Sequence, residues 1–319
     1  MRERIGPNEA VELARGVFEE RIVTRGTEID RTATVSMASV LRYFEHTRWC
    51  VMQRPLLGLI DLIDQGHFFV VRSQVVELRR RIGQGQPLVL TTRFLDVGRS
   101  TATVIHEALR ERDGAVVARA RVTGVWLAPS RRPARIPDSM RSVTRAEASL
   151  NEGGSGHEGE ADGVVELAEV HGGEASSFIA PPEKVFTPLS VRIEPPLEPP
   201  EPARAIHRLV VPSRDLDVFS HVNAATFLHY ADDARDAEAE RLGLAPEVAR
   251  GFVARVGLFY QREARRGDQL ALHLVPLGER ALGVWCRREG PGGEEPLVAM
   301  RLDLVPGARA VTEPGPSQA

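Results

Sequence analysis

An internal repeat constrains this chain more than any other feature of its sequence. The segment EIDRTATVSMASVLRYFEHTR, residues 28–48, aligns without a gap with DLDVFSHVNAATFLHYADDAR, residues 215–235. In each copy an acid, Asp30 or Asp217, is followed by five residues and then by Ser36 or Asn223, both good helix N-caps. A repeat in register over this length predicts two copies of one domain.

Apolar spacing predicts a helix after each cap. Met37 begins a run with apolar residues at i, i+3, i+4 and i+7, and Ala224 begins a matching run. Segments with strand-like alternation follow in each half, at 87–97, 101–109 and 115–128, and at 252–261, 269–275, 281–288 and 296–305. A helix whose apolar face covers an antiparallel meander is an α+β arrangement.

Composition divides the chain into two domains and a linker. The middle contains NEGGSGHEGEADG and IEPPLEPPEP, which are rich in Gly, Pro and Glu and cannot bury enough apolar surface to fold alone. We therefore expect an N-terminal domain at 1–140, a linker at 141–204, a C-terminal domain at 205–306 and a disordered tail at 307–319. Homo-oligomerisation stays open.

Whole-chain properties exclude several classes of function. The chain is 42% hydrophobic and 27% charged, and no apolar run approaches the length of about 20 residues that spans a bilayer. The N-terminus has no apolar export signal, so the cytoplasm is expected. A net charge of −3 disfavours nucleic-acid binding. Cys50 and Cys286 lack metal-ligand spacing, so we expect no metal and no other cofactor.

The sequence DLDVFSHVNAATFLHYADDAR resembles the motif of hotdog-fold thioesterases, of the acyl-ACP and 4-hydroxybenzoyl-CoA thioesterase type. The resemblance covers about 18–128 and 205–306 and implies two tandem hotdog domains, each a long helix wrapped by an antiparallel sheet. Because the sheets of hotdog domains commonly pair, it also implies that the two halves pack on each other as a pseudo-dimer. It implies that Asp217 is the catalytic carboxylate and that His221 is the motif histidine. Phe219 and Ala224 depart from the plant acyl-ACP pattern, which has asparagine at both positions.

Elementary chemistry suggests how these residues would act. Thioester hydrolysis needs a carboxylate base or nucleophile and donors for the developing oxyanion. Backbone N–H groups of Ala224 and Ala225, behind the Asn223 cap, would be such donors. His221 would orient water or the carboxylate. Each residue also has a structural interpretation, as a turn, a packed histidine or a cap.

The first copy offers a second candidate. Asp30 matches Asp217, but Thr34 and Ser36 stand where the second copy has His221 and Asn223. Asp30 is therefore either a second catalytic residue or a retained structural acid.

Arginines recur before a glycine turn in both halves. Residues 79–81 are all arginine, and the second half has Arg262, Arg265 and Arg266. Arginine forks bind phosphates well. Arg80, Arg262, Arg265 and Arg266 are thus candidates to hold coenzyme A or an acidic carrier protein, and the alternative is a solvated strand end.

The sequence therefore predicts an acyl thioesterase acting on acyl-CoA or acyl-ACP. Two alternatives remain, a non-catalytic acyl-CoA-binding hotdog module and a hotdog hydratase or dehydratase. The chain lacks the Gly-Asp-x-Asn-Pro-x-x-x-His arrangement typical of the latter enzymes.

Overall fold

The computed structural model describes residues 17–54, 57–141, 195–200, 202–217 and 219–306. Its strands form one continuous ten-stranded sheet in the order β1-β3-β4-β5-β2-β7-β10-β9-β8-β6. The bounds in the first half are β1 Val17–Val23, β2 Phe68–Leu78, β3 Pro87–Val97, β4 Thr101–Arg110 and β5 Val116–Leu127. Those in the second half are β6 Ala205–Val210, β7 Phe252–Tyr260, β8 Gln269–Pro276, β9 Ala281–Gly290 and β10 Gly293–Val305.

Both halves have the same strand order, and the two copies meet edge to edge. Strands β2 and β7 pair antiparallel, from Ser73 opposite Phe259 to Glu77 opposite Arg255. The five strands on either side of this junction follow matching orders, which relates the halves by a pseudo-twofold axis. The predicted pseudo-dimer is confirmed.

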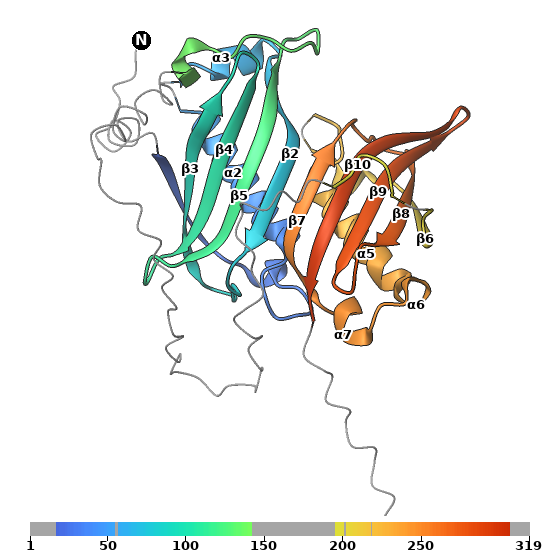
Figure 1. Cartoon of the computed structure of the whole chain (residues 1–319). Coiled ribbons are helices and arrows are strands. Elements are labelled where there is room, and N and C mark those ends of the chain that lie inside the picture. Colours follow the sequence, from blue (N-terminus) through green and yellow to red (C-terminus); the bar gives the residue numbers. More distant parts are fainter. Residues whose placement is uncertain (1–16, 55–56, 142–194, 201, 218, 307–319) are drawn as a thin grey trace, which may run out of the picture.

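The helices lie on one face of this sheet (Figure 1). The long helices are α2, Met37–Met52, and α5, Thr226–Ala237; α3 Ile60–Asp64, α6 Ala239–Leu242 and α7 Pro246–Ala249 are short. Val40 and Leu41 of α2 and Leu228 of α5 are buried in one hydrophobic cluster that continues into both halves of the sheet, including Val76 and Val256. One core therefore serves both copies, as expected when two helix faces and one sheet bury each other.

The expected meander is only part of each sheet. Strands β3, β4 and β5 form it, as predicted, but β2 pairs on the far side of β5 and β1 pairs with β3. The strands β1, β2 and β6 were not predicted, because their alternation is weak and they contact partners that are distant in sequence. No described helix is long and apolar enough to cross a membrane.

Most of the expected linker and tail lies outside the described residues. The described end of the linker, 195–200, packs against the second half: the Trp285 indole Nε1–H donates to the carbonyl of Pro196 at 2.9 Å, and Arg287 pairs with Glu198.

Candidate functional site

The two acid-containing loops share one backbone conformation. Asp30 N–H donates to the Thr34 carbonyl at 2.9 Å, and Asp217 N–H donates to the His221 carbonyl at 2.7 Å. Ala33 and Ser220, at matching positions, both take positive φ values of 57° and 64°. This conformation is uncommon for residues other than glycine, so its recurrence shows that the repeat extends to the details of the loop.

Asp217 is held by one of its two carboxylate oxygens. Its Oδ1 accepts from Phe219 N–H at 2.8 Å and from His221 N–H at 3.2 Å. Its Oδ2 accepts no hydrogen bond from any described residue. Asp30 is held in the same way, because its Oδ1 accepts from Thr32 N–H at 2.7 Å. One oxygen of Asp217 therefore stabilises the loop, and the other is available for chemistry.

His221 has a partner that the sequence did not reveal. Its Nε2 lies 2.9 Å from Oε2 of Glu263, which follows β7, and its side chain is 14% exposed. The other oxygen of Glu263 accepts from Arg131 at 2.6 Å. Glu263 stands within the arginine-rich stretch 262–266, in which the sequence pattern indicated only the arginines, as phosphate-binding candidates. The structure thus places a second carboxylate on the motif histidine.

Asn223 links the second-half loop to the first half. Its Nδ2 donates to both carboxylate oxygens of Glu45 in α2, at 2.9 and 3.1 Å, and its Oδ1 accepts from Ala225 N–H at 2.9 Å. Helix α5 begins only at Thr226, so Asn223 caps the turn that precedes the helix. The expected oxyanion donor at Ala225 is wrong, because that N–H is already used. The N–H of Ala224 meets no acceptor among the described residues.

A buried polar cluster supports this turn from beneath. The Tyr260 hydroxyl donates to the Ala224 carbonyl at 3.2 Å and accepts from Gln74 of β2 at 2.6 Å. Burial raises the pKa of Tyr260, so the phenol stays neutral and keeps its donor. Arg48 lies nearby in the buried part of α2, and burial lowers the pKa of its guanidinium, whereas the charge of Glu45 favours the protonated form. Residues from both halves therefore position Ala224.

Aromatic side chains from both halves stack at the loop. Phe219, 44% exposed, stacks on Trp49 of α2 with ring centroids 5.9 Å apart and on Phe68 of β2 at 6.3 Å. Arg131 packs over the ring of Phe68, with its guanidinium carbon 5.5 Å from the ring centre. The departure at position 219 thus creates an apolar rim that joins the halves.

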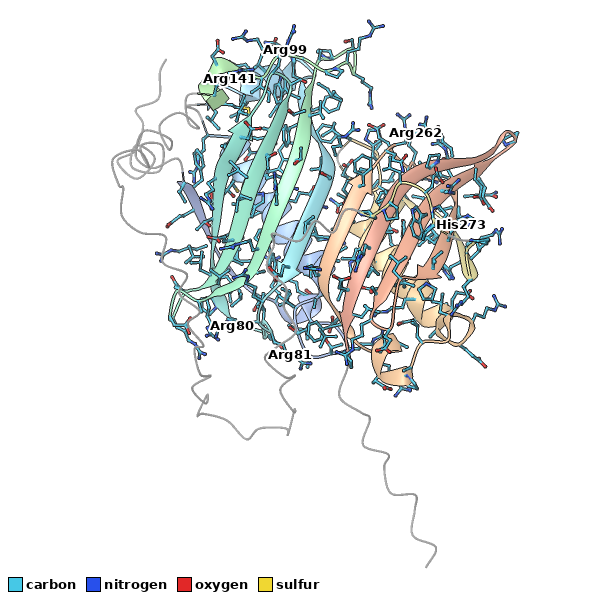
Figure 2. The ribbon with its side chains drawn as sticks, viewed as in Figure 1. Arg80, Arg81, Arg99, Arg141, Arg262 and His273 are labelled. Carbon is cyan, nitrogen blue, oxygen red and sulfur yellow. The ribbon has the colours of Figure 1, made fainter. Side chains whose placement is uncertain are left out.

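The arginines do not form a single surface. Figure 2 shows Arg80 and Arg81 at one end of the sheet and Arg262 at the other. Arg262 pairs with Glu295 at 2.9 Å, and Arg265 lies 3.7 Å from Glu263. Arg80 and Arg266 form no ion pair with a described residue. The pseudo-twofold axis separates the two groups, so only the second one lies beside His221 and Glu263.

Asp30 lies in a different place from Asp217. It lines a cavity of about 350 Å³ between the first-copy loop and α5, together with Ser36, Asp232 and Arg235. The structure therefore does not bring the two aspartates together. In the part of the chain that the structure describes, no group of three or more His, Cys, Asp or Glu side chains is arranged to hold a metal ion.

Comparison with known proteins agrees with the tandem fold. Residues 24–143 match the family model of the thioesterase-like superfamily. An acyl-ACP thioesterase from Bacteroides thetaiotaomicron has the same fold over 92% of this chain and 99% of its own, with a TM-score of 0.61 and 15% identity. The chain is a tandem hotdog protein. A 12:0-ACP thioesterase from Umbellularia californica also superposes on this tandem hotdog chain. The match covers 91% of this chain and 97% of that one, with a TM-score of 0.61 and 16% identity.

The sequence of the tandem hotdog protein matches no curated protein. The family model falls on its first half, although the second half carries the fuller motif with His221 and Asn223.

Proposed function

We propose that the chain is an acyl thioesterase, which hydrolyses acyl-CoA or acyl-ACP thioesters at the second-copy loop. The observation that carries this proposal is Asp217, which has one oxygen fixed by backbone N–H groups and the other available, in the same loop as His221, which pairs with Glu263. The tandem hotdog fold and the superfamily match of the first half support the same reaction class.

The chemistry assigns one role to each group. The free oxygen of Asp217 removes a proton from water, the water oxygen attacks the thioester carbonyl carbon, and the C–S bond then breaks as the thiolate takes up a proton. The Ala224 N–H, held in place through its own carbonyl by Tyr260, donates to the oxyanion. The Glu263 carboxylate fixes the ring orientation of His221, whose other ring nitrogen orients the attacking water, and the proton taken up by Asp217 passes to the leaving thiolate.

Asp217 also suits a nucleophilic role, in which its carboxylate forms an anhydride that water then opens. Single-turnover hydrolysis in ¹⁸O-labelled water separates the two routes. General-base catalysis puts the label only into the released acid, whereas label in the peptide that contains Asp217 demonstrates the nucleophilic route with water opening the anhydride at the Asp217 carbonyl.

The site belongs to both halves. Glu45 of α2 orients Asn223 through two hydrogen bonds, and Trp49 and Phe68 of the first half stack on Phe219 at the rim. We infer that the acyl group enters along this apolar rim. Arg262, Arg265 and Arg266 lie in the same segment as Glu263 and would meet the phosphates of coenzyme A or the acidic face of a carrier protein.

A thiol-release assay tests the proposal. The purified full chain is incubated with short-, medium- and long-chain acyl-CoA esters, with an aromatic acyl-CoA and with matched acyl-ACP, and free thiol is followed with time. Thiol release that saturates with substrate supports hydrolysis. Saturable binding by calorimetry without thiol release would replace the proposal with an acyl-CoA-binding module.

A further inference from the structure

The first-copy loop and helix α5 line an open cavity that the thioesterase proposal leaves unused. It holds about 350 Å³ and is the pseudo-symmetric counterpart of the Asn223–Glu45 contact. Ser36 replaces Asn223, and Asp232 replaces Glu45 with one methylene fewer. In the second copy the longer side chains meet at 2.9 Å, whereas the shorter pair in the first copy leaves space between loop and helix.

A buried cation with spare donors lines this cavity. The Arg235 side chain is only 4% exposed, and its Nε and Nη1 are buried without a hydrogen-bond partner, although Nε lies 3.8 Å from Oδ1 of Asp236. Its Nη2 lies 3.3 Å from Oδ1 of Asp232, an oxygen that is also buried and accepts no hydrogen bond. Leaving a buried charged donor unsatisfied is costly, so these atoms indicate a ligand that accepts hydrogen bonds.

The start of α2 adds a second donor at the same place. Met37, the first residue of this 16-residue helix, lines the cavity, and its backbone N–H meets no acceptor among the described residues. Such an N–H carries the positive end of the helix dipole. The cavity therefore offers two kinds of donor to one anionic group.

The neighbouring acids limit the charge of that group. Oδ1 of Asp30 accepts from Thr32, Asp236 pairs with Arg31, and Glu28 accepts from the Tyr43 hydroxyl at 2.5 Å. These three carboxylates are engaged but still repel a dianion such as phosphate. Ile29, Phe252 and Val253 contribute apolar surface to the lining. A monoanion with a small apolar body fits both conditions.

We propose that this cavity is a binding site for a small monocarboxylic acid, with the carboxylate on Arg235 and the Met37 N–H and its apolar part against Phe252 and Val253. Two carboxyl groups can lie side by side only if they share a proton, and Asp232 is the group that supplies it. The site is separate from Asp217, so the inference holds whether or not the chain hydrolyses thioesters.

The proton makes binding depend on pH in a definite direction. Burial raises the pKa of Asp232 to about 6, against the opposing effect of Arg235. Burial and the charge of Arg42 lower the pKa of the nearby His229, which favours its neutral form. The charged and titratable groups that line the cavity around Asp232 are Glu28, Asp30 and Arg31 from the loop, Arg42 from α2, and His229, Arg235 and Asp236 from α5. Affinity for a carboxylate should therefore fall as pH rises above 6, by up to about tenfold per unit for one proton.

Isothermal titration of the full chain with hexanoate tests this site, with hexylamine as a cationic control of matched size. We expect hexanoate to bind at pH 6 and to weaken markedly by pH 8, and hexylamine not to bind. Asp232→Asn, whose amide can donate without a proton, should bind hexanoate with nearly the same affinity at both pH values. Arg235→Lys should weaken binding at pH 6 by about tenfold or more, because the guanidinium fork is lost.

Three outcomes overturn the proposal. They are no hexanoate binding at pH 6, hexanoate binding that both variants leave unchanged, and loss of hexanoate binding in Asp217→Asn, which would put the carboxylate in the other site. If Arg235→Lys fails to fold, the pH dependence of Asp232→Asn decides alone. The titration measures binding and does not depend on turnover. A chain that binds hexanoate but releases no thiol in the separate assay would therefore refute the thioesterase proposal and leave this one standing.

Discussion

Replacing Asp217 with asparagine separates its chemical role from its structural role. The side-chain oxygen of asparagine can still accept from the Phe219 and His221 N–H groups, at 2.8 and 3.2 Å in the native loop. The group that changes is the free oxygen, which becomes an NH₂ donor and can no longer take a proton or attack carbon. The loop should therefore survive while the chemistry fails.

The structure sets the expected magnitudes. Loss of a general base lowers kcat by roughly 100- to 10,000-fold, or about 3 to 5 kcal/mol in the activation free energy. The free energy of unfolding should change by less than about 1 kcal/mol, because both backbone hydrogen bonds persist. For a chain of this size that is a shift in Tm of a few degrees at most. Asp217→Ala removes both hydrogen bonds as well, so it should lower kcat equally and lower Tm further.

Asp30→Asn is the matched control, because Asp30 occupies the same turn and its Oδ1 accepts from Thr32 N–H at 2.7 Å. We expect this variant to keep most of the wild-type kcat in the thiol-release assay, with its fold checked by circular dichroism. His221→Ala should lie between the two aspartate variants. A folded Asp217→Asn with full turnover would refute the assignment, and equal losses from both aspartates would mean that each half has a working site.

Two further predictions concern contacts between distant segments. In Glu45→Gln one of the two carboxylate oxygens that accept from Asn223 becomes an amide nitrogen, which weakens this contact. We expect kcat to fall about tenfold with little change in Tm. An unchanged kcat would show that the contact is only structural. Gly251→Ala would place a Cβ 2.2 Å from the Val305 carbonyl oxygen, which should cost about 1–3 kcal/mol of unfolding free energy, measured by denaturant titration. Gly83→Ala, where a Cβ has open space, is its control, and equal destabilisation of the two variants would argue against the overlap.

The sequence revealed the parts of the fold that depend on local interactions. The acid and the cap lie in one loop whose hydrogen bonds join residues a few positions apart, so an alignment of the two copies sufficed to find both loops. Strand β3 was predicted at 87–97, which are its bounds, because its alternation is complete. Strand β2 was missed, since most of its N-terminal half is partly buried and its partners β5 and β7 are far along the chain.

The site residues that sequence reasoning missed are those contributed by another element. Glu45 stands in the middle of an amphipathic helix, where a charged residue normally faces solvent, and only the crossing of α2 past the second-half loop brings it to Asn223. Glu263 was obscured by the arginines around it, although its position after β7 places it on His221. The expected donor at Ala225 failed for a local reason, because Asn223 capped that N–H itself.

The pseudo-twofold axis explains why the two copies can have different roles while sharing one core. Each loop faces the helix of the other half, so Glu45 completes the second-copy loop and Asp232 faces the first. A substitution at Glu45 or Asp232 therefore acts on the loop of the opposite half, whereas Tyr43 and Tyr230 bond the loops of their own halves. In the second copy a long pair, Asn223 and Glu45, fixes the turn that carries Ala224, whereas the shorter Ser36 and Asp232 leave room for a ligand. Because the halves are covalently joined and share the β2–β7 junction, one copy can retain the geometry for chemistry and the other can bind a different molecule without loss of the common sheet.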